Sequence, residues 1–257
     1  MRGVDAQQQQ DLIRLLRPIA DDEWIVGHRG SEWLGLAPDL EEDLAFSSIH
    51  QDEMGHALFF YELLHSLGDP EPDHQVYFRS PEAWHNARLV EQPNGDWATT
   101  VLRRYCYEVF DDLRLAALAE SSYAPLRDGV KKIRREEAYH LKHFTLWMEL
   151  LARGGEEAFQ RLTAAIPTVW GELGDLFYVG ESEAFLHRLG LPGLTESVLR
   201  ERWRATVRSA MEDWGLPWPG DPSPVRASGR LGHHLPEMTA LLDTMTEVRR
   251  FAPDSVW

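Results

Sequence analysis

Two long helical stripes of apolar residues in this sequence are each interrupted by a glutamate and a histidine three positions apart. The first stripe carries Glu53 and His56, and the second carries Glu137 and His140. Residues three apart on an α-helix project from nearly the same face, so each pair is expected to point inward with its apolar neighbours. Because a buried carboxylate is costly without a partner, two such interruptions indicate a shared buried ligand such as a metal. The stripes read Phe46, Ile49, Glu53, His56, Phe60, Leu63 and Ile133, Glu137, His140, Phe144, Trp147, Leu151.

The Glu-x-x-His motif alone is weak evidence, because the sequence contains five copies of it. The copies that begin at Glu71 and Glu82 stand next to prolines, outside any long helical pattern. A third copy begins at Glu62, about half a turn around the helix from Glu53, and is expected to face solvent. Only the two copies on the apolar stripes are therefore predicted to be buried.

Single glutamates on two other predicted helices complete the set. Glu23 continues an apolar stripe and stands thirty residues before Glu53, while Glu108 stands twenty-nine residues before Glu137. Four-helix di-metal carboxylate proteins take one Glu from each of two helices and a Glu-x-x-His pair from each of the other two. The nearly equal offsets predict two helical hairpins around one site. The predicted metal ligands are Glu23, Glu53, His56, Glu108, Glu137 and His140.

A second set of residues, Glu32, Glu62 and His65, also has a thirty-residue offset. Glu32 follows Gly30 in a predicted loop, and Glu62 is predicted to face solvent. Burial, and not the offset alone, therefore selects the ligands.

The donor set suggests which metal would bind. Four carboxylates and two imidazoles suit iron or manganese better than a tetrahedral structural zinc, and we expect two iron ions, with manganese as the alternative. Asp52 and Glu136 directly precede the two motifs and are candidates to orient the ligand imidazoles by hydrogen bonds. No catalytic residue is identified beyond the metal site. Spacing assigns no role to His143 or to the pair His233 and His234.

Helical periodicity without alternating β-branched runs predicts an all-α fold. Core helices are expected at about 9–30, 40–67, 96–121 and 125–153, and Pro18 is expected to kink or restart the first of them. The proline-rich stretch 69–96 reads as a long crossover, as in ferritin-like folds. We expect one domain, 1–257, with a four-helix-bundle core at about 9–153 and accessory helices at about 156–257. The accessory helices are predicted at 156–188, 195–214 and 236–251.

The net charge limits the classes of partner, and the cysteine content and the N-terminal sequence bear on the cellular compartment. The formal net charge is −16, which disfavours nucleic acid and anionic membranes and favours a basic protein partner. Cys106 is the only cysteine, so no intrachain disulfide is expected, and no charged-then-apolar leader follows Met1. No apolar run approaches the ~20 residues needed to span a bilayer. We therefore expect a cytoplasmic protein.

Three segments carry a family resemblance. They are SEWLGLAPDLEEDLAFSSIHQDEMGHA at 31–57, LVEQPNGDWATTVLRRY at 89–105 and SGRLGHH at 228–234. They resemble the C subunits (PaaC) of phenylacetyl-CoA epoxidase, over nearly the whole chain. The resemblance implies a multicomponent bacterial monooxygenase that uses dioxygen to epoxidise the aromatic ring of phenylacetyl-CoA. In that family the A subunit (PaaA) holds the working di-iron site, and the C subunit is a ferritin-like structural partner that has lost ligands. This chain departs from that pattern, since all six ligands are present.

We therefore expect an oxygen-activating subunit of a phenylacetyl-CoA epoxidase in aerobic phenylacetate catabolism. The chain has no glycine-rich dinucleotide loop and no cysteine cluster, so electrons are expected from a separate flavin and iron–sulfur reductase. The expected partner is a homologous A subunit or a second copy of the chain, with an acyl-CoA as the substrate of the complex. Two alternatives stay open: a non-catalytic subunit that stabilises a catalytic homologue, and a ferritin-like iron-oxidising protein.

Overall fold

The computed structural model describes residues 5–179, 183–224, 227–253 and 255. Over these residues the chain forms ten α-helices, four short 3-10 helices and no strand. The predicted fold class, all-α and ferritin-like, is confirmed. In the part of the chain described, no helix is both long enough and apolar enough to cross a membrane. The contacts divide the chain into two compact units, Met1–Pro93 with Arg226–Trp257, and Asn94–Val225.

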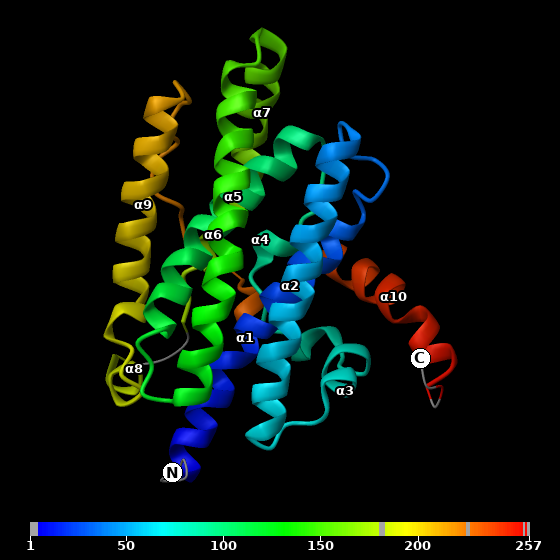
Figure 1. Ribbon diagram of the computed structural model, residues 1–257, viewed down its shortest axis with the longest axis vertical. Helices are drawn as coiled ribbons and strands as arrows, with labels where there is room; N and C mark the ends of the chain where they lie inside the picture. The colour runs from blue at the N-terminus through cyan, green and yellow to red at the C-terminus, as the bar shows by residue number, and fades with distance from the viewer. Residues whose placement is uncertain (1–4, 180–182, 225–226, 254, 256–257) are drawn as a thin grey trace. The chain divides into compact units, whose positions relative to one another are not determined.

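The first unit is built on a helical hairpin. Helix α1 (Ala6–Ser31) and helix α2 (Leu40–Ser66) pack side by side (Figure 1). The carboxylate of Asp39 caps α2 by accepting a hydrogen bond from the backbone N–H of Glu42 at 2.8 Å. Helix α1 runs unbroken through Pro18, so the proline neither ends nor restarts it.

Short helices pack around this hairpin. The segment predicted as an irregular crossover contains α3 (Pro72–Tyr77), the 3-10 helix η1 (Pro81–Ala83) and α4 (Arg88–Glu91). Its prolines and short elements confirm that no long helix forms there. Helix α10 (Pro236–Phe251), which follows the 3-10 helix η4 (Gly229–Leu231), packs against these pieces, so the C-terminal segment belongs to the first unit.

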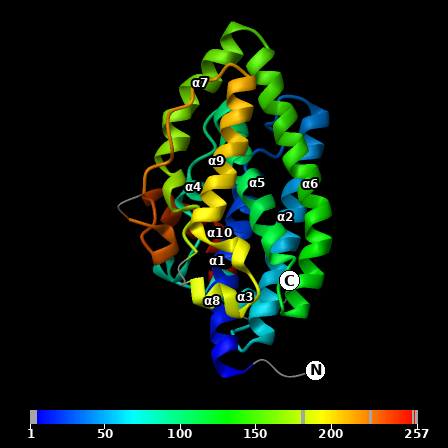
Figure 2. The same cartoon turned by 90° about the vertical axis from the view of Figure 1, so that its left-hand side faces the viewer.

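The second unit is centred on helix α5 (Trp97–Leu118). Helices α6 (Ala124–Arg153), α7 (Glu156–Gly171) and α9 (Glu196–Asp213) all pack against it (Figure 2). Every residue of α5 from 101 to 111 is buried, so all faces of this helix are covered.

The prediction of a single accessory helix at 156–188 is wrong. Helix α7 ends at Gly171, the 3-10 helix η2 (Leu173–Asp175) follows, and α8 (Glu183–Arg188) is a separate short helix. Two glycines, Gly171 and Gly174, fall in this stretch, and glycine disfavours a helix interior by about 1 kcal/mol relative to alanine. The break lets Leu173 and Phe177 turn into the core, where both are buried.

Candidate metal centre

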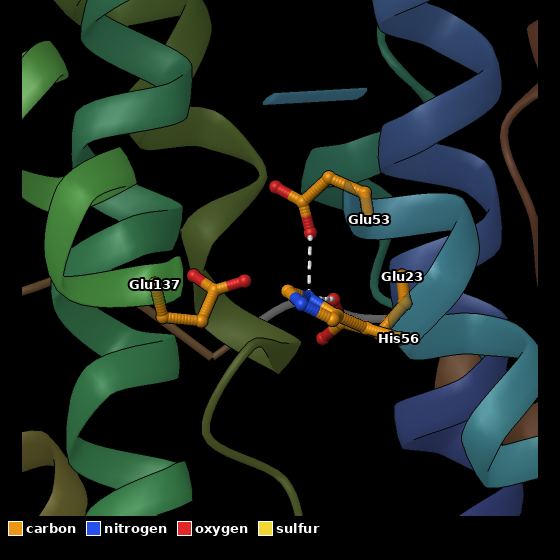
Figure 3. Close-up of side chains that lie close together, drawn as sticks. All are labelled: Glu23, Glu53, His56 and Glu137. Atoms are coloured by element: carbon orange, nitrogen blue, oxygen red, sulfur yellow. Dashed lines mark ion pairs between the residues drawn. The ribbon is translucent and has the colours of Figure 1, made fainter. Parts of the chain in front are cut away.

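The first unit brings together three of the predicted ligands. Glu23 on α1 and Glu53 and His56 on α2 are all at most 3% exposed. The Nδ1 atom of His56 lies 3.9 Å from a carboxylate oxygen of each glutamate. Ligand atoms of all three residues lie within 4.8 Å of one another. Figure 3 shows these side chains close together, with the ion pair between Glu53 and His56 dashed.

Glycines explain why α1 and α2 approach closely near these residues. Gly27 and Gly30 follow Glu23 by one and two turns and lie on the same face of α1. A Cβ atom at Gly27 would lie 2.8 Å from the sulfur of Met54, and one at Gly30 would overlap the ring of His50. At Gly30 only glycine leaves room for α2, and at Gly27 a side chain would have to displace Met54, so the two glycines let the helix that carries Glu53 and His56 pack tightly beside Glu23.

The second unit brings together the other three predicted ligands. Glu108 on α5 and Glu137 and His140 on α6 are buried, and the Nδ1 atom of His140 lies 3.3 Å from an oxygen of Glu137. Ligand atoms of these three residues also lie within 4.8 Å of one another. The guanidinium of Arg104, one turn before Glu108, forms an ion pair with its carboxylate and lies 4.9 Å from the centre of the Phe144 ring.

The structure thus forms two clusters, each with two carboxylates and one imidazole. We call Glu23, Glu53 and His56 the α1–α2 half-site, and Glu108, Glu137 and His140 the α5–α6 half-site. That both clusters serve one metal centre stays a prediction. The donor chemistry suits a hard divalent cation, since each half-site offers carboxylate oxygens and an imidazole nitrogen in a buried place.

Several neighbouring predictions have mixed outcomes. Glu32, Glu62 and His65 are exposed, which confirms the ground on which the alternative set was rejected. The residues Asp52 and Glu136 are half-buried, and their orientation of the ligand imidazoles stays a prediction. His143 is half-buried on α6, with its ring 5.1 Å from that of Phe144, and it belongs to neither half-site.

Sequence reasoning missed a buried carboxylate just before Glu23. Asp21 accepts hydrogen bonds from Tyr61 at 2.7 Å, from Arg79 at 2.5 Å and from the backbone N–H of His85 at 2.8 Å. Burial alone would raise the pKa of Asp21. The charge of Arg79 and the hydrogen bonds from Arg79, Tyr61 and the backbone of His85 outweigh the effect of burial and lower the pKa. The side chain of Arg79 also stacks over the ring of Trp84 at 4.2 Å.

The next residue, Asp22, is also completely buried. Both of its oxygens accept from the guanidinium of Arg230, at 2.8 and 2.7 Å, and one also accepts from the backbone N–H of Ala87 at 2.8 Å. Three consecutive acids at 21–23 span about 200° of a helix, so they could not all face solvent beside a buried stripe. That was a signal in the sequence that a further acid beside Glu23 would be buried, although it did not indicate the partner.

His234, left without a role by its spacing, lies in the same region. Its Nδ1 contacts a carboxylate oxygen of the buried Glu91 at 2.5 Å, and its Nε2 contacts the carbonyl oxygen of Trp84 at 3.0 Å. The other oxygen of Glu91 accepts from the backbone N–H of Leu235 at 2.6 Å. The C-terminal tail is therefore tied to the crossover and to α1, whereas the neighbouring His233 is exposed.

Comparison with known proteins agrees with this architecture. The family described as phenylacetic acid catabolic protein matches residues 3–257. The C subunit of 1,2-phenylacetyl-CoA epoxidase from Escherichia coli (strain K12) is 30% identical over 240 residues, which covers 93% of this chain and 96% of that protein. The A subunit of the same epoxidase is 26% identical over 163 residues, covering 63% of this chain and 52% of that protein. The chain belongs to the phenylacetic acid catabolic protein family.

Proposed function

We propose that this chain is a metal-binding, oxygen-activating subunit of an epoxidase that acts in phenylacetate catabolism. The observation that carries the proposal is the pair of buried half-sites, each with two carboxylates and one imidazole. Together they match the ligand inventory of four-helix di-iron carboxylate proteins, one Glu from each of two helices and a Glu-x-x-His pair from each of the others. The proposal requires the two units to fold as one ferritin-like domain with both half-sites facing a common centre.

The chain's own residues would bind and shield the metals. Glu23, Glu53 and His56 would hold one side of the centre, and Glu108, Glu137 and His140 the other. A bound di-iron pair would supply activation of dioxygen. Burial of every one of these side chains excludes bulk water, which favours an apolar aromatic substrate over an ionic one.

The relatives suggest the wider reaction. Both epoxidase subunits are named for 1,2-phenylacetyl-CoA, so we propose an aromatic acyl-CoA as the substrate of the assembled complex. We further propose that the partner is a homologous subunit, or else a second copy of this chain, and that a separate flavin and iron–sulfur reductase donates the electrons. We also propose a cytoplasmic location for the chain.

Metal analysis after anaerobic ferrous reconstitution is the first test. We expect about two iron ions per chain, the number that a four-helix carboxylate site binds. Less than about one iron ion per chain would refute the proposal. Iron oxidation by the chain alone, without any reductase, would favour a ferritin-like iron-oxidising protein instead.

Substitution of one ligand makes the test specific. Glu137→Ala should abolish iron binding at the α5–α6 half-site while the helical content stays unchanged. Glu62→Ala is the matched control, because Glu62 begins another Glu-x-x-His copy but is exposed on α2. Turnover of phenylacetyl-CoA by a reconstituted complex should be lost with Glu137→Ala and kept with Glu62→Ala. Unchanged turnover with Glu137→Ala would show that this site is not the catalyst.

A non-catalytic role in the complex is the second candidate function. It is favoured by the 30% identity to the C subunit over almost the full length, against 26% to the A subunit over a shorter stretch. In that case the complex should keep its activity when Glu53 and Glu137 are both replaced by alanine, and should lose it only when the chain is omitted.

A further inference from the structure

One of the four candidate glutamate ligands is paired with a cation from its own helix. Arg104 and Glu108 stand one turn apart on α5 and form an ion pair, with the two side chains 4% and 0% exposed. The guanidinium also lies over the ring of Phe144, which follows His140 by one turn on α6. Arg104 is therefore a buried cation beside the α5–α6 half-site.

The other three glutamates have a different neighbour at the same position. Four residues before Glu23, Glu53 and Glu137 the chain carries an isoleucine in each case, and all three isoleucines are buried. An apolar residue there packs the helix face and forms no ion pair. Arg104 breaks this repeated pattern at the fourth ligand, which argues against a packing role for it alone. The isoleucines are Ile19, Ile49 and Ile133.

A metal ion and a guanidinium bind the same group. Both are attracted to carboxylate oxygens, and a carboxylate whose negative charge is already offset by an arginine binds a metal ion less tightly. The α5–α6 half-site carries two carboxylates, and Arg104 offsets one of their charges. In a buried place such a charge strongly affects the binding of a second cation.

We propose that Arg104 is a counter-cation that competes with the metal for the charge of Glu108, so that the guanidinium weakens metal loading of the α5–α6 half-site. The proposal rests on the proposed function, because it takes Glu108 as a metal ligand. In the metal-free protein Arg104 neutralises a buried carboxylate and stabilises the fold. In the loaded protein the same side chain weakens metal binding. Arg104 is thus a residue that sets metal affinity without being a ligand.

Manganese binding provides the measurement. Free Mn²⁺ gives an EPR signal that is lost on binding, so titration of the full chain yields the stoichiometry and the dissociation constants. Arg104→Met removes the charge but keeps an unbranched apolar side chain. We expect its weaker Mn²⁺ site to bind about tenfold more tightly or better than in the wild type, the scale of one charged hydrogen bond. Arg104→Lys keeps the charge and should bind as the wild type does.

A neighbouring arginine offers a matched control. Arg103 is equally buried, but it donates a hydrogen bond to the side-chain oxygen of Asn94 at 2.5 Å. Arg103→Met should leave Mn²⁺ affinity unchanged even if it lowers stability. A purely structural role of Arg104 would lower the unfolding midpoint equally with and without Mn²⁺. Competition instead predicts that Arg104→Met lowers the midpoint in chelator and shows a larger rise than the wild type when Mn²⁺ is added.

Each outcome decides the question. One outcome is that the wild type binds Mn²⁺ and Arg104→Met folds but binds Mn²⁺ no more tightly. The proposed competition is then wrong, while the proposed metal centre stands. Equal affinities for the Lys and Met variants would also overturn it. Should Arg104→Met fail to fold, Arg104→Gln against Arg104→Lys gives the same contrast of charge. If neither the wild type nor any variant binds Mn²⁺ or Fe²⁺, the metal centre fails and the competition with it.

Discussion

The two helices that carry the single glutamates predicted as ligands, α1 and α5, obtain cations for some of their buried acids from different places. Helix α1 carries Asp21 and Asp22 directly before Glu23. Their partners are Arg79, in the crossover, and Arg230, in the C-terminal tail, which is 208 residues away in sequence from Asp22. Asp21 and Asp22 therefore gain these arginine partners only after distant segments have come together, whereas Asp11, near the start of the same helix, is paired locally with Arg14.

In helix α5, two buried acids are paired with arginines of the same helix. Glu108 is paired with Arg104, and Asp111 accepts a hydrogen bond from Arg114 at 2.7 Å, both within the same helix. A local pair within a helix closes almost no loop, whereas a pair across the chain also carries the entropy cost of closing a long loop, a cost that grows slowly with loop length. Two buried acids of α5, Glu108 and Asp111, thus have an arginine partner within their own helix, while Asp21 and Asp22 of α1 depend on the crossover and the tail for theirs.

Loss of the tail arginine should have the largest effect. Arg230→Met leaves the carboxylate of Asp22 charged and buried, and removing one partner of a buried pair typically costs about 3–5 kcal/mol. We expect a decrease of that size in the free energy of unfolding, measured by urea denaturation. Arg208→Met, which breaks an exposed pair with Glu212 on α9, should produce no measurable change. A loss below about 1 kcal/mol for Arg230→Met would place that pair among surface pairs and contradict the dependence of α1 on the tail.

Breaking the local pair on α5 should cost less. Glu108→Gln removes the negative charge but keeps an oxygen that can accept a hydrogen bond from the guanidinium of Arg104, so in metal-free protein we expect a loss below the ~3–5 kcal/mol of a fully broken buried pair. The double variant Arg104→Met with Glu108→Gln should recover much of this loss, because a buried pair replaced as a whole is often neutral. Urea denaturation in the presence of a chelator gives both values. If the two single losses simply add in the double variant, the two residues are not coupled.

The sequence contained much of the fold because the helices of this chain follow simple periodicity. The bounds expected for the two hairpins agree with α1, α2, α5 and α6 to within a few residues. The two Glu-x-x-His pairs were recognised because they interrupt apolar stripes, and all four residues are buried. Both signals come from residues that are close together in the chain, so a single sequence is enough to detect them.

The parts that could not be predicted depend on segments far apart in the chain. Nothing near Asp22 indicates that Arg230 will reach it, since that pairing follows from how the tail packs. Glu108 could not be distinguished by burial alone, because every residue of α5 between 101 and 111 is buried. Arg104 is different, since its position four residues before Glu108 was a visible local signal.

The smallest expected effect concerns the pH dependence of the tail contact. Burial alone would lower the pKa of His234, but the hydrogen bond and charge of Glu91 outweigh it, with a contribution from the Trp84 carbonyl, and the pKa is raised. Both ring nitrogens contact acceptors, as expected for a charged imidazolium. A histidine with a raised pKa adds stability that is complete below its unfolded pKa of about 6.5 and is lost as pH rises through the folded pKa.

His234→Gln should therefore lower the unfolding midpoint most at about pH 5.5, and the difference from wild type should shrink as pH rises toward about 9. His28 and His85 have lowered pKa values, mainly through burial, so they titrate in the opposite sense, but they contribute equally to both proteins. His233→Gln is the control, because this neighbour is exposed, and its midpoint should follow the wild type throughout. A difference that stays constant or grows with pH would show that His234 holds the tail by packing and not by its charge on Glu91. In that case only the arginine pairs would distinguish Asp21 and Asp22, whose partners come from distant segments, from Glu108 and Asp111, whose partners lie within α5.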